Sequence, residues 1–214
     1  MKLKNYLKPE EYAQLDEYSK IFSNPIGKIV HAKRFETIHN LVKKHYSKGK
    51  KILDLCCGLC EWNMDNLDVV GLDVNHKALE MAKKYGRISK IIVSDGLKNN
   101  LPRNSFDILV NSQVLEHMKS PGDLIIEIRR LLKNKGILIL AVPYDTVLSL
   151  WRPLFFVRCL WDGRIKGNKY FLKNGGHVNK FSPKSLAKLL KKHGFEILEI
   201  INDYRFTITI VAKK

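Results

Sequence analysis

Two acidic side chains, Asp54 and Asp73, end two short apolar segments and lie 19 residues apart. The first is followed by a turn of mostly small residues, Cys56-Cys57-Gly58-Leu59-Cys60. In α/β proteins such a turn lets the backbone approach a ligand, and the acid ending the next strand binds the two hydroxyl groups of a ribose. The pair therefore predicts a site for a nucleoside-containing cofactor at the carboxyl ends of parallel strands.

Three of the four cysteines crowd into the same turn, at Cys56, Cys57 and Cys60. Such a cluster could suggest a metal, but a closed zinc site needs four ligands, usually as two separated pairs, and only Cys159 remains. We therefore expect no metal here and interpret the cysteines as small residues lining a ligand loop. Crowded cysteines also differ from a disulfide framework, which favours a reducing, cytoplasmic compartment.

Short apolar runs alternate with helical segments through the middle of the chain. The runs cover residues 51–55, 69–74, 88–94, 106–111 and 136–142, and helical patterns cover 75–84 and 121–133. Ser182 and Pro183 mark the start of a later helix, and two further strands, 196–201 and 205–212, form a hairpin. This order predicts a doubly wound, Rossmann-like α/β sheet with helices on both faces.

We expect residues 1–214 to form a single domain with two additions to the sheet. Residues 1–48 read as an N-terminal helical segment with a break at 24–27, and residues 143–181 as an inserted lid or substrate segment. Residues 61–66 predict a short, polar first helix after the cysteine turn. No apolar run is long enough to span a membrane, and no signal peptide is visible.

Six motifs, in order and suitably spaced, resemble those of class I S-adenosylmethionine-dependent methyltransferases, in the broad small-molecule (methyltransferase type 11-like) group. They lie at residues 52–58, 71–74, 94–96, 106–118, 129–138 and, in the late segment, 176–182 with 194–196. The resemblance implies a seven-stranded sheet of order 3-2-1-4-5-7-6 with strand 7 antiparallel. It also implies S-adenosylmethionine as the cofactor. Cys56 and Cys60 replace glycines of the family's first motif, which would cost about 1–3 kcal/mol of strain if φ is positive there.

The resemblance assigns cofactor-binding positions along the carboxyl edge of the sheet. They are Asp54, Cys56, Gly58, Cys60, Asp73, Val74, Asp95, Gly96, Asn111 and Ser112. Two histidines, His117 and His177, are candidate general bases, because histidine is the usual base at neutral pH. His117 could instead cap a helix or brace its loop, and His177 could be a basic surface residue.

The net charge of +17 falls in two flanking segments, since residues 1–50 hold eleven basic and five acidic side chains, and residues 151–194 hold eleven basic side chains and one acidic one. A basic surface favours anionic partners, although a lysine-rich proteome would give the same excess. Within it, residues 148–161 combine aromatic and arginine side chains. They could form a lid over a small substrate, an ordinary packed insertion, a peripheral membrane contact or, least favoured, a nucleic-acid surface.

The sequence therefore predicts methyl transfer to a small acceptor that is lipid-like or anionic. Two alternatives stay open: an RNA methyltransferase, and a non-catalytic binding module that kept the fold. The acceptor and the oligomeric state are not predicted.

Overall fold

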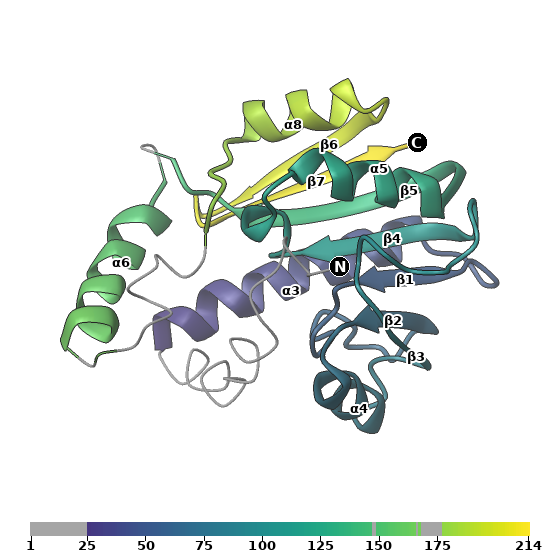
Figure 1. The fold of residues 1–214 in the computed structure, drawn as a ribbon, viewed down its shortest axis with the longest axis horizontal. Helices are drawn as coiled ribbons and strands as arrows, with labels where there is room; N and C mark the ends of the chain where they lie inside the picture. Colours follow the sequence, from purple (N-terminus) through teal and green to yellow (C-terminus); the bar gives the residue numbers. More distant parts are fainter. Residues whose placement is uncertain (1–24, 147–148, 166, 168–176) are drawn as a thin grey trace.

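The computed structural model describes residues 25–146, 149–165, 167 and 177–214, and its centre is a seven-stranded sheet (Figure 1). The strands are β1 (Ile52–Leu55), β2 (Val69–Asp73), β3 (Lys90–Val93), β4 (Phe106–Ser112), β5 (Leu132–Pro143), β6 (Glu196–Asp203) and β7 (Thr207–Lys213). Their order is β3-β2-β1-β4-β5-β7-β6, with β7 antiparallel to both neighbours. The predicted Rossmann-like class and strand order are confirmed.

The four central pairings are parallel, so β1, β2, β3 and β4 all end at one edge of the sheet. Strand order reverses between β1 and β4, and ligands of open α/β sheets bind outside the carboxyl ends at this switch point. All four residues of β1 are buried, as expected of a strand covered on both faces.

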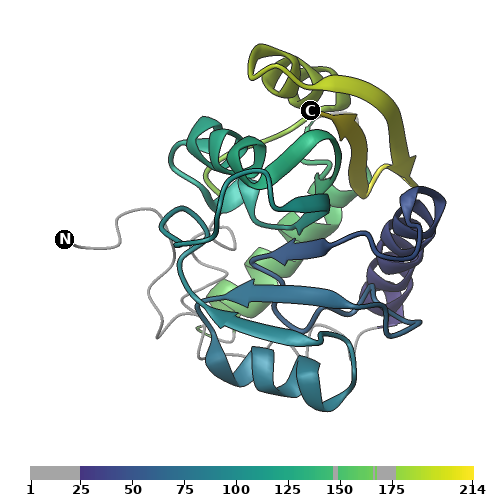
Figure 2. The ribbon, with the colours of Figure 1, turned by 90° about the vertical axis from the view of Figure 1, so that its right-hand side faces the viewer.

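Helices cover both faces of the sheet, as Figure 2 shows. One buried cluster joins the sheet to α3 (Pro25–His45) and α4 (His76–Lys84), through residues such as Ile38 and Leu79. The other joins it to α5 (Pro121–Leu131) and α8 (Pro183–Lys192), through Leu124 and Leu186. The three-layer arrangement therefore follows from apolar residues on both faces of nearly every central strand.

The predicted helix at 183 begins as expected. The Ser182 hydroxyl accepts a hydrogen bond from the Ser185 backbone N–H, the Ser185 hydroxyl faces the Ser182 N–H in return, and Pro183 occupies the first turn. This capping box satisfies two backbone donors that a helix start leaves open.

Other local expectations were wrong. Within the break predicted at 24–27, residues 25–27 are the start of α3, because proline is well suited to the first turn of a helix, and residue 24 lies outside the described residues. The earlier half of the 1–48 segment lies outside the described residues. Residues 61–66 form turns instead of a short helix. There the buried Asn63 amide donates to the carbonyls of Leu67 and Arg87, and its oxygen accepts from Leu67 N–H, which holds the chain in a loop.

The described part of the 143–181 segment forms an arm. Helix α6 (Trp151–Arg158) continues into a π-helical turn, η2 (Cys159–Ile165), and together we call them the α6–η2 arm. In Figure 1 the arm stands to the side of the sheet, beyond the carboxyl ends of β1 and β4. None of the helices in the described ranges is both long and apolar enough to cross a membrane. The division of the chain into one domain with two additions stays a prediction.

Candidate active site

The cysteine turn after β1 takes left-handed backbone angles. The φ angles of Cys56, Gly58 and Cys60 are +59°, +51° and +47°. Two of the three residues therefore carry a Cβ in a region that favours glycine, which is the condition under which strain was expected. Cys60 is almost fully buried, and burial raises the pKa of its thiol and of the Cys57 thiol well above the ordinary value. These buried thiols are protonated groups that shape the loop.

Asp73, the last residue of β2, links this loop to the next one. Its carboxylate accepts hydrogen bonds from the backbone N–H groups of Gly58 and Asn75, both at 2.9 Å. Burial raises the pKa of Asp73, and the bonds from Asn75, Gly58 and Val74 oppose that shift. Asp73 thereby brings the cysteine turn and the start of α4 together at the end of the sheet.

Asp54, the acid of the first motif, is turned into the protein. The Trp62 indole N–H donates to its Oδ2 at 2.7 Å, and the residue is 2% exposed. Burial raises the pKa of Asp54 to about 7, although the bonds from Trp62 and Cys60 act to lower it. Asp54 therefore stabilises the turn from its buried side, through the hydrogen bond from Trp62. A direct contact between Asp54 and the cofactor stays a prediction.

The residues after β3 are placed at the same edge. Asp95 accepts a hydrogen bond from Leu97 N–H at 2.7 Å and is half-buried, while Gly96 is buried. Val74, which follows Asp73, is also half-buried. These positions are compatible with the adenine and ribose side of a nucleoside site.

Buried polar atoms without a hydrogen-bond partner gather at the end of β4 and in the residues that follow it. Among the described residues they include Asn111 Oδ1, Ser112 Oγ, Gln113 Nε2 and both carboxylate oxygens of Glu116. The Asn111 amide also donates to Leu55 O at 2.8 Å, which fixes its orientation beside β1. Unpartnered buried polar groups cost free energy, so a run of them in six residues indicates a surface that is completed by a polar ligand.

The two candidate histidines meet, although they lie 60 residues apart in the chain. The rings of His117 and His177 are in edge contact with centroids 5.0 Å apart, and Phe155 of α6 stacks on His177 at 5.1 Å. The backbone N–H groups of Val178 and Asn179 donate to Glu116 O, which attaches the late segment to the short 3-10 helix η1 (Leu115–His117). The reading of His177 as a surface residue is therefore wrong, since its side chain is 9% exposed.

Two carboxylates belong to this cluster. His177 Nδ1 lies 3.7 Å from Asp145 Oδ2, and the His177 ring lowers the pKa of Asp145. Burial raises the pKa of Glu116 to about 7, while the electrostatic interactions with His177 and Arg34 act to lower it. The cluster therefore holds several groups that could accept a proton near neutral pH.

The same cluster has the spacing of a metal site. One ligand atom each from Glu116, His117 and His177 lie within 4.8 Å of one another. The cysteines, which the sequence analysis considered first, form no comparable group within the described ranges. The expectation that no metal is used stays a prediction.

Three further residues of the site, Glu116, Asp145 and Arg34, were not predicted from the sequence. Arg34 of α3 is 4% exposed, and its charge partly opposes the burial that raises the pKa of both Glu61 and Glu116. Glu116 lies within the motif at residues 106–118, but its burial depends on tertiary packing. Asp145 and Arg34 carried no signal of their own, because their neighbours in space are distant in sequence.

The fold and this arrangement of groups at the carboxyl edge define a class I methyltransferase, and comparison with known proteins agrees. A family model described as a methyltransferase domain matches residues 28–200, which is most of the chain. The chain therefore belongs to the S-adenosylmethionine-dependent methyltransferases of class I, and S-adenosylmethionine is its cofactor.

Two curated relatives and one solved structure illustrate the similarity. A demethylmenaquinone methyltransferase of Thermotoga maritima is 30% identical over 168 residues, covering 69% of this chain and 71% of the relative. A ubiquinone biosynthesis O-methyltransferase of Glaesserella parasuis is 29% identical over 176 residues, covering 74% and 70%. A SAM-dependent methyltransferase structure from Thermotoga maritima superposes with a TM-score of 0.65 at 19% identity, covering 94% and 95%, which supports the fold.

The strain at Cys56 is open to a direct test. Cys56→Gly should raise the free energy of unfolding by about 1 kcal/mol, because glycine adopts positive φ without a Cβ penalty. Cys57→Gly is the matched control: Cys57 packs against a buried cluster and has no positive φ, so that change should be destabilising. Urea unfolding of both variants measures the difference. Equal destabilisation by both would show that Cys56 is not strained.

The raised pKa of Asp54 predicts a pH-dependent stability. The folded state keeps the Asp54 proton up to a pKa of about 7, whereas the unfolded chain releases it near 4, so stability falls as pH rises between these values. For Asp54 alone the fall from pH 5 to pH 8 is about 2–3 kcal/mol. Asp54→Asn should flatten the profile of the ligand-free protein, measured by urea unfolding across that range. The exposed Asp123→Asn serves as control, and an unchanged slope in Asp54→Asn would contradict the assignment.

Proposed function

We propose that this enzyme transfers the methyl group of S-adenosylmethionine to a hydroxyl group on a small, apolar, lipid-like acceptor, with the His177–Asp145 pair as the general base. The observation that carries the proposal is the histidine cluster at the carboxyl edge, closed on one side by the Phe155 ring. The relatives are named as methyltransferases of ubiquinone biosynthesis and of demethylmenaquinone, which supports an acceptor of this chemical class.

The unpartnered polar atoms and the loops around Asp73 fit the cofactor. We assign the ribose hydroxyls to Asp73, the adenine to Asp95 and Gly96, and the backbone approach to the turn 56–60. Asn111 and Ser112 would face the methionine end, with their open polar atoms available to it. Buried Arg34 supplies a positive charge on the Glu61 and Glu116 side of the site, where it suits the carboxylate of the methionine part.

When bound, S-adenosylmethionine supplies a methyl group that the sulfonium already activates. The protein then needs to align the acceptor oxygen and to remove its proton. His177 takes that proton, and Asp145, 3.7 Å from its Nδ1, stabilises the charged ring that results. The acceptor oxygen forms a bond to the methyl carbon while the carbon–sulfur bond breaks and its electron pair stays on sulfur.

We assign Glu116 and His117 roles that differ from the role of His177 as the base. Neither carboxylate oxygen of Glu116 has a described hydrogen-bond partner, and its pKa of about 7 lets it hold or release a proton at neutral pH. We assign it to hold the acceptor hydroxyl and to receive the proton from the histidine pair. His117, in edge contact with His177, positions the ring.

The α6–η2 arm gives a route for an apolar acceptor. Its exposed large apolar side chains are Leu154, Phe156, Val157, Leu160, Trp161 and Ile165. Exposed groups of this extent mark interaction surfaces. The basic excess of residues 151–194 complements anionic lipid headgroups, so we assign the arm to peripheral contact with a membrane. Phe155 of the same helix stacks on His177, and this contact supports a route for the acceptor along the arm to the histidine cluster.

The transfer reaction is tested with a phenol or hydroquinone that bears a short isoprenoid tail. S-adenosylhomocysteine should bind the wild type, and His177→Gln should lower kcat by about 10²–10³-fold without changing that binding, since a general base contributes about this much. The pH–rate profile should lose its basic limb in the variant. Calorimetry and a methyl-transfer assay measure the two effects.

The exposed His76→Gln, on α4, is the matched control and should leave kcat unchanged. If S-adenosylhomocysteine does not bind at a concentration of about 1 mM, the non-catalytic binding module is favoured. Equal activity of the wild type and His177→Gln would refute the proposed base.

The membrane contact is tested with Phe156→Ser combined with Trp161→Ser. Both side chains are more than half exposed, so the fold should persist while binding to vesicles of phosphatidylglycerol weakens about tenfold or more. Met81→Ser, which removes an exposed apolar group from α4, is the control and should bind as the wild type does. Cosedimentation with anionic and neutral vesicles gives the comparison. Tighter binding to single-stranded RNA than to vesicles would favour the RNA methyltransferase instead.

A further inference from the structure

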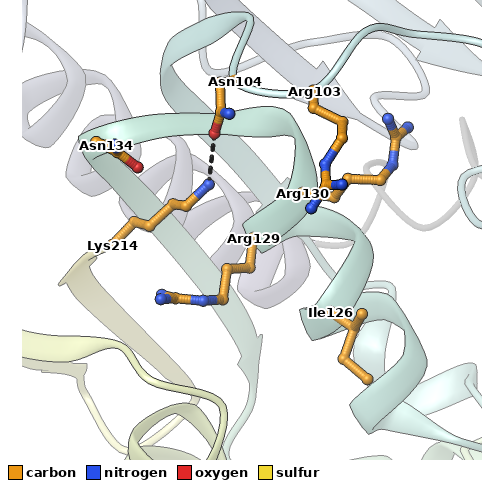
Figure 3. Close-up of a pocket in the computed structure, with 7 residues that line it drawn as sticks. All are labelled: Arg103, Asn104, Ile126, Arg129, Arg130, Asn134 and Lys214. Carbon is orange, nitrogen blue, oxygen red and sulfur yellow. Dashed lines mark hydrogen bonds between the residues drawn. The ribbon is translucent and has the colours of Figure 1, made fainter.

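A concave, strongly basic region lies at the opposite edge of the sheet from the candidate active site. It is a hollow of about 590 Å³ lined by Arg103, Asn104, Ile126, Arg129, Arg130, Asn134 and Lys214, shown in Figure 3. Arg103 and Asn104 precede β4, and the seven residues of β4 separate them from the carboxyl edge by roughly 20 Å. The proposed methyl transfer therefore does not use this region.

Four cations line the hollow, and no acidic residue does. Arg130 is neutralised, because its guanidinium pairs with Glu127 at 2.6 and 2.7 Å. Arg129 donates to the Gly194 carbonyl and stacks over the Phe195 ring, neither of which carries a charge. The Arg103 side chain is exposed and has no ion pair within the part of the chain that the structure describes.

Lys214 is the fourth cation of the hollow, and both its backbone and its side chain are hydrogen-bonded. Its backbone exchanges hydrogen bonds with Lys135 N–H and Gly136 O. Its ammonium group donates to Asn104 Oδ1 at 2.8 Å and to Leu132 O at 2.6 Å, so one of its three N–H donors remains for another acceptor. Burial lowers the pKa of Lys214, and the charges of Arg129 and Arg103 lower it further, which shows that these cations repel one another.

Helix electrostatics explain only part of the cluster. Basic residues in the last turn of α5, such as Arg129 and Arg130, stabilise the negative end of the helix dipole. Lys214, from the strand end after β7, also serves this helix end, because its ammonium donates to the carbonyl of Leu132, the C-cap of α5. Arg103 has no such bond to α5 among the described residues, and an anion bound between these cations would offset their mutual repulsion.

We propose that this hollow, which we call the basic hollow, binds the diphosphate group of a small molecule. Three cations, Arg103, Arg129 and Lys214, lack a described carboxylate partner. A single phosphate ester carries about −1.5 to −2 charges at pH 7 and would leave the set only partly neutralised. A terminal diphosphate carries more charge and offers the several acceptor oxygens that two guanidinium groups and an ammonium can share.

The remaining lining suits the rest of such a molecule. Ile126 is 57% exposed at the margin of the hollow and offers an apolar contact, while Asn104 and Asn134 offer amide groups. A single concave region fits one small ligand, whereas a nucleic acid needs a stripe of positive charge that follows its backbone. The observations therefore favour a small diphosphate over RNA.

Inorganic pyrophosphate is the probe, titrated into the full chain by calorimetry with S-adenosylhomocysteine at saturation to occupy the cofactor site. Pyrophosphate should bind at one site with a Kd of about 0.1 mM. Arg103→Gln should weaken binding about tenfold, since it removes a charge-assisted contact from an exposed side chain that has no ion pair among the described residues. Lys184→Gln removes the same charge from an exposed position at the start of α8 and should change binding less than about twofold.

Two further ligands identify the chemistry. Citrate, which is anionic without phosphate, should bind more weakly than pyrophosphate. The proposal is overturned if pyrophosphate does not bind at about 10 mM, if citrate binds equally, or if Lys184→Gln weakens binding as much as Arg103→Gln. Displacement of pyrophosphate by a short single-stranded RNA of higher affinity would also overturn it, in favour of nucleic acid. Methyl transfer by Arg103→Gln should stay at the wild-type rate, so this test and that of the proposed function fail independently.

Discussion

The carboxylate of Asp73 joins the two loops on which the cofactor site depends. Gly58 N–H and Asn75 N–H reach it from either side, and both bonds are 2.9 Å long. They are possible because β1 and β2 are parallel neighbours, with Leu55 opposite Leu72, so that the two strands end together. Gly71 lets the side chains of Ile88 and Cys57 pack against the β2 backbone, because a Cβ there would lie within 3.0 Å of atoms of Ile88 and of Cys57 Sγ. The site therefore depends on strand register first and on side-chain chemistry second.

Buried acids make the ligand-free site a compromise between stability and function. Asp54 and Glu116 both have a pKa of about 7, in each case mainly because of burial. Asp54 is compensated by the Trp62 indole, whereas the Glu116 carboxylate has no hydrogen bond among the described residues. An enzyme that binds a polar ligand can leave such groups open, since the ligand supplies the partners when it binds.

The sequence predicted the sheet well because its signals are local. Short apolar runs, the Ser182 cap and the acids at strand ends each act within a few residues, and the family resemblance supplied the strand order. The conformation of residues 61–66 was not predictable, because it depends on the Asn63 amide meeting the carbonyl of Arg87. The meeting of His117 with His177 and the burial of Arg34 likewise depend on packing between segments far apart in the chain. Strain at Cys56 and Cys60 was expected only if their φ angles are positive, and in the structure both are positive.

The position of β7 has a consequence for biosynthesis. Thr207–Lys213 lies between β5 and β6 and is the last of the seven strands to leave the ribosome. Until it emerges, β5 has no partner on its outer side, and the apolar residues that β7 contributes to both buried clusters are missing. A nascent chain with six strands therefore carries an open, apolar sheet edge, the kind of surface that chaperones bind and that aggregates when left uncovered. Completion of the sheet therefore waits for the last of its strands in chain order, although that strand occupies an interior position.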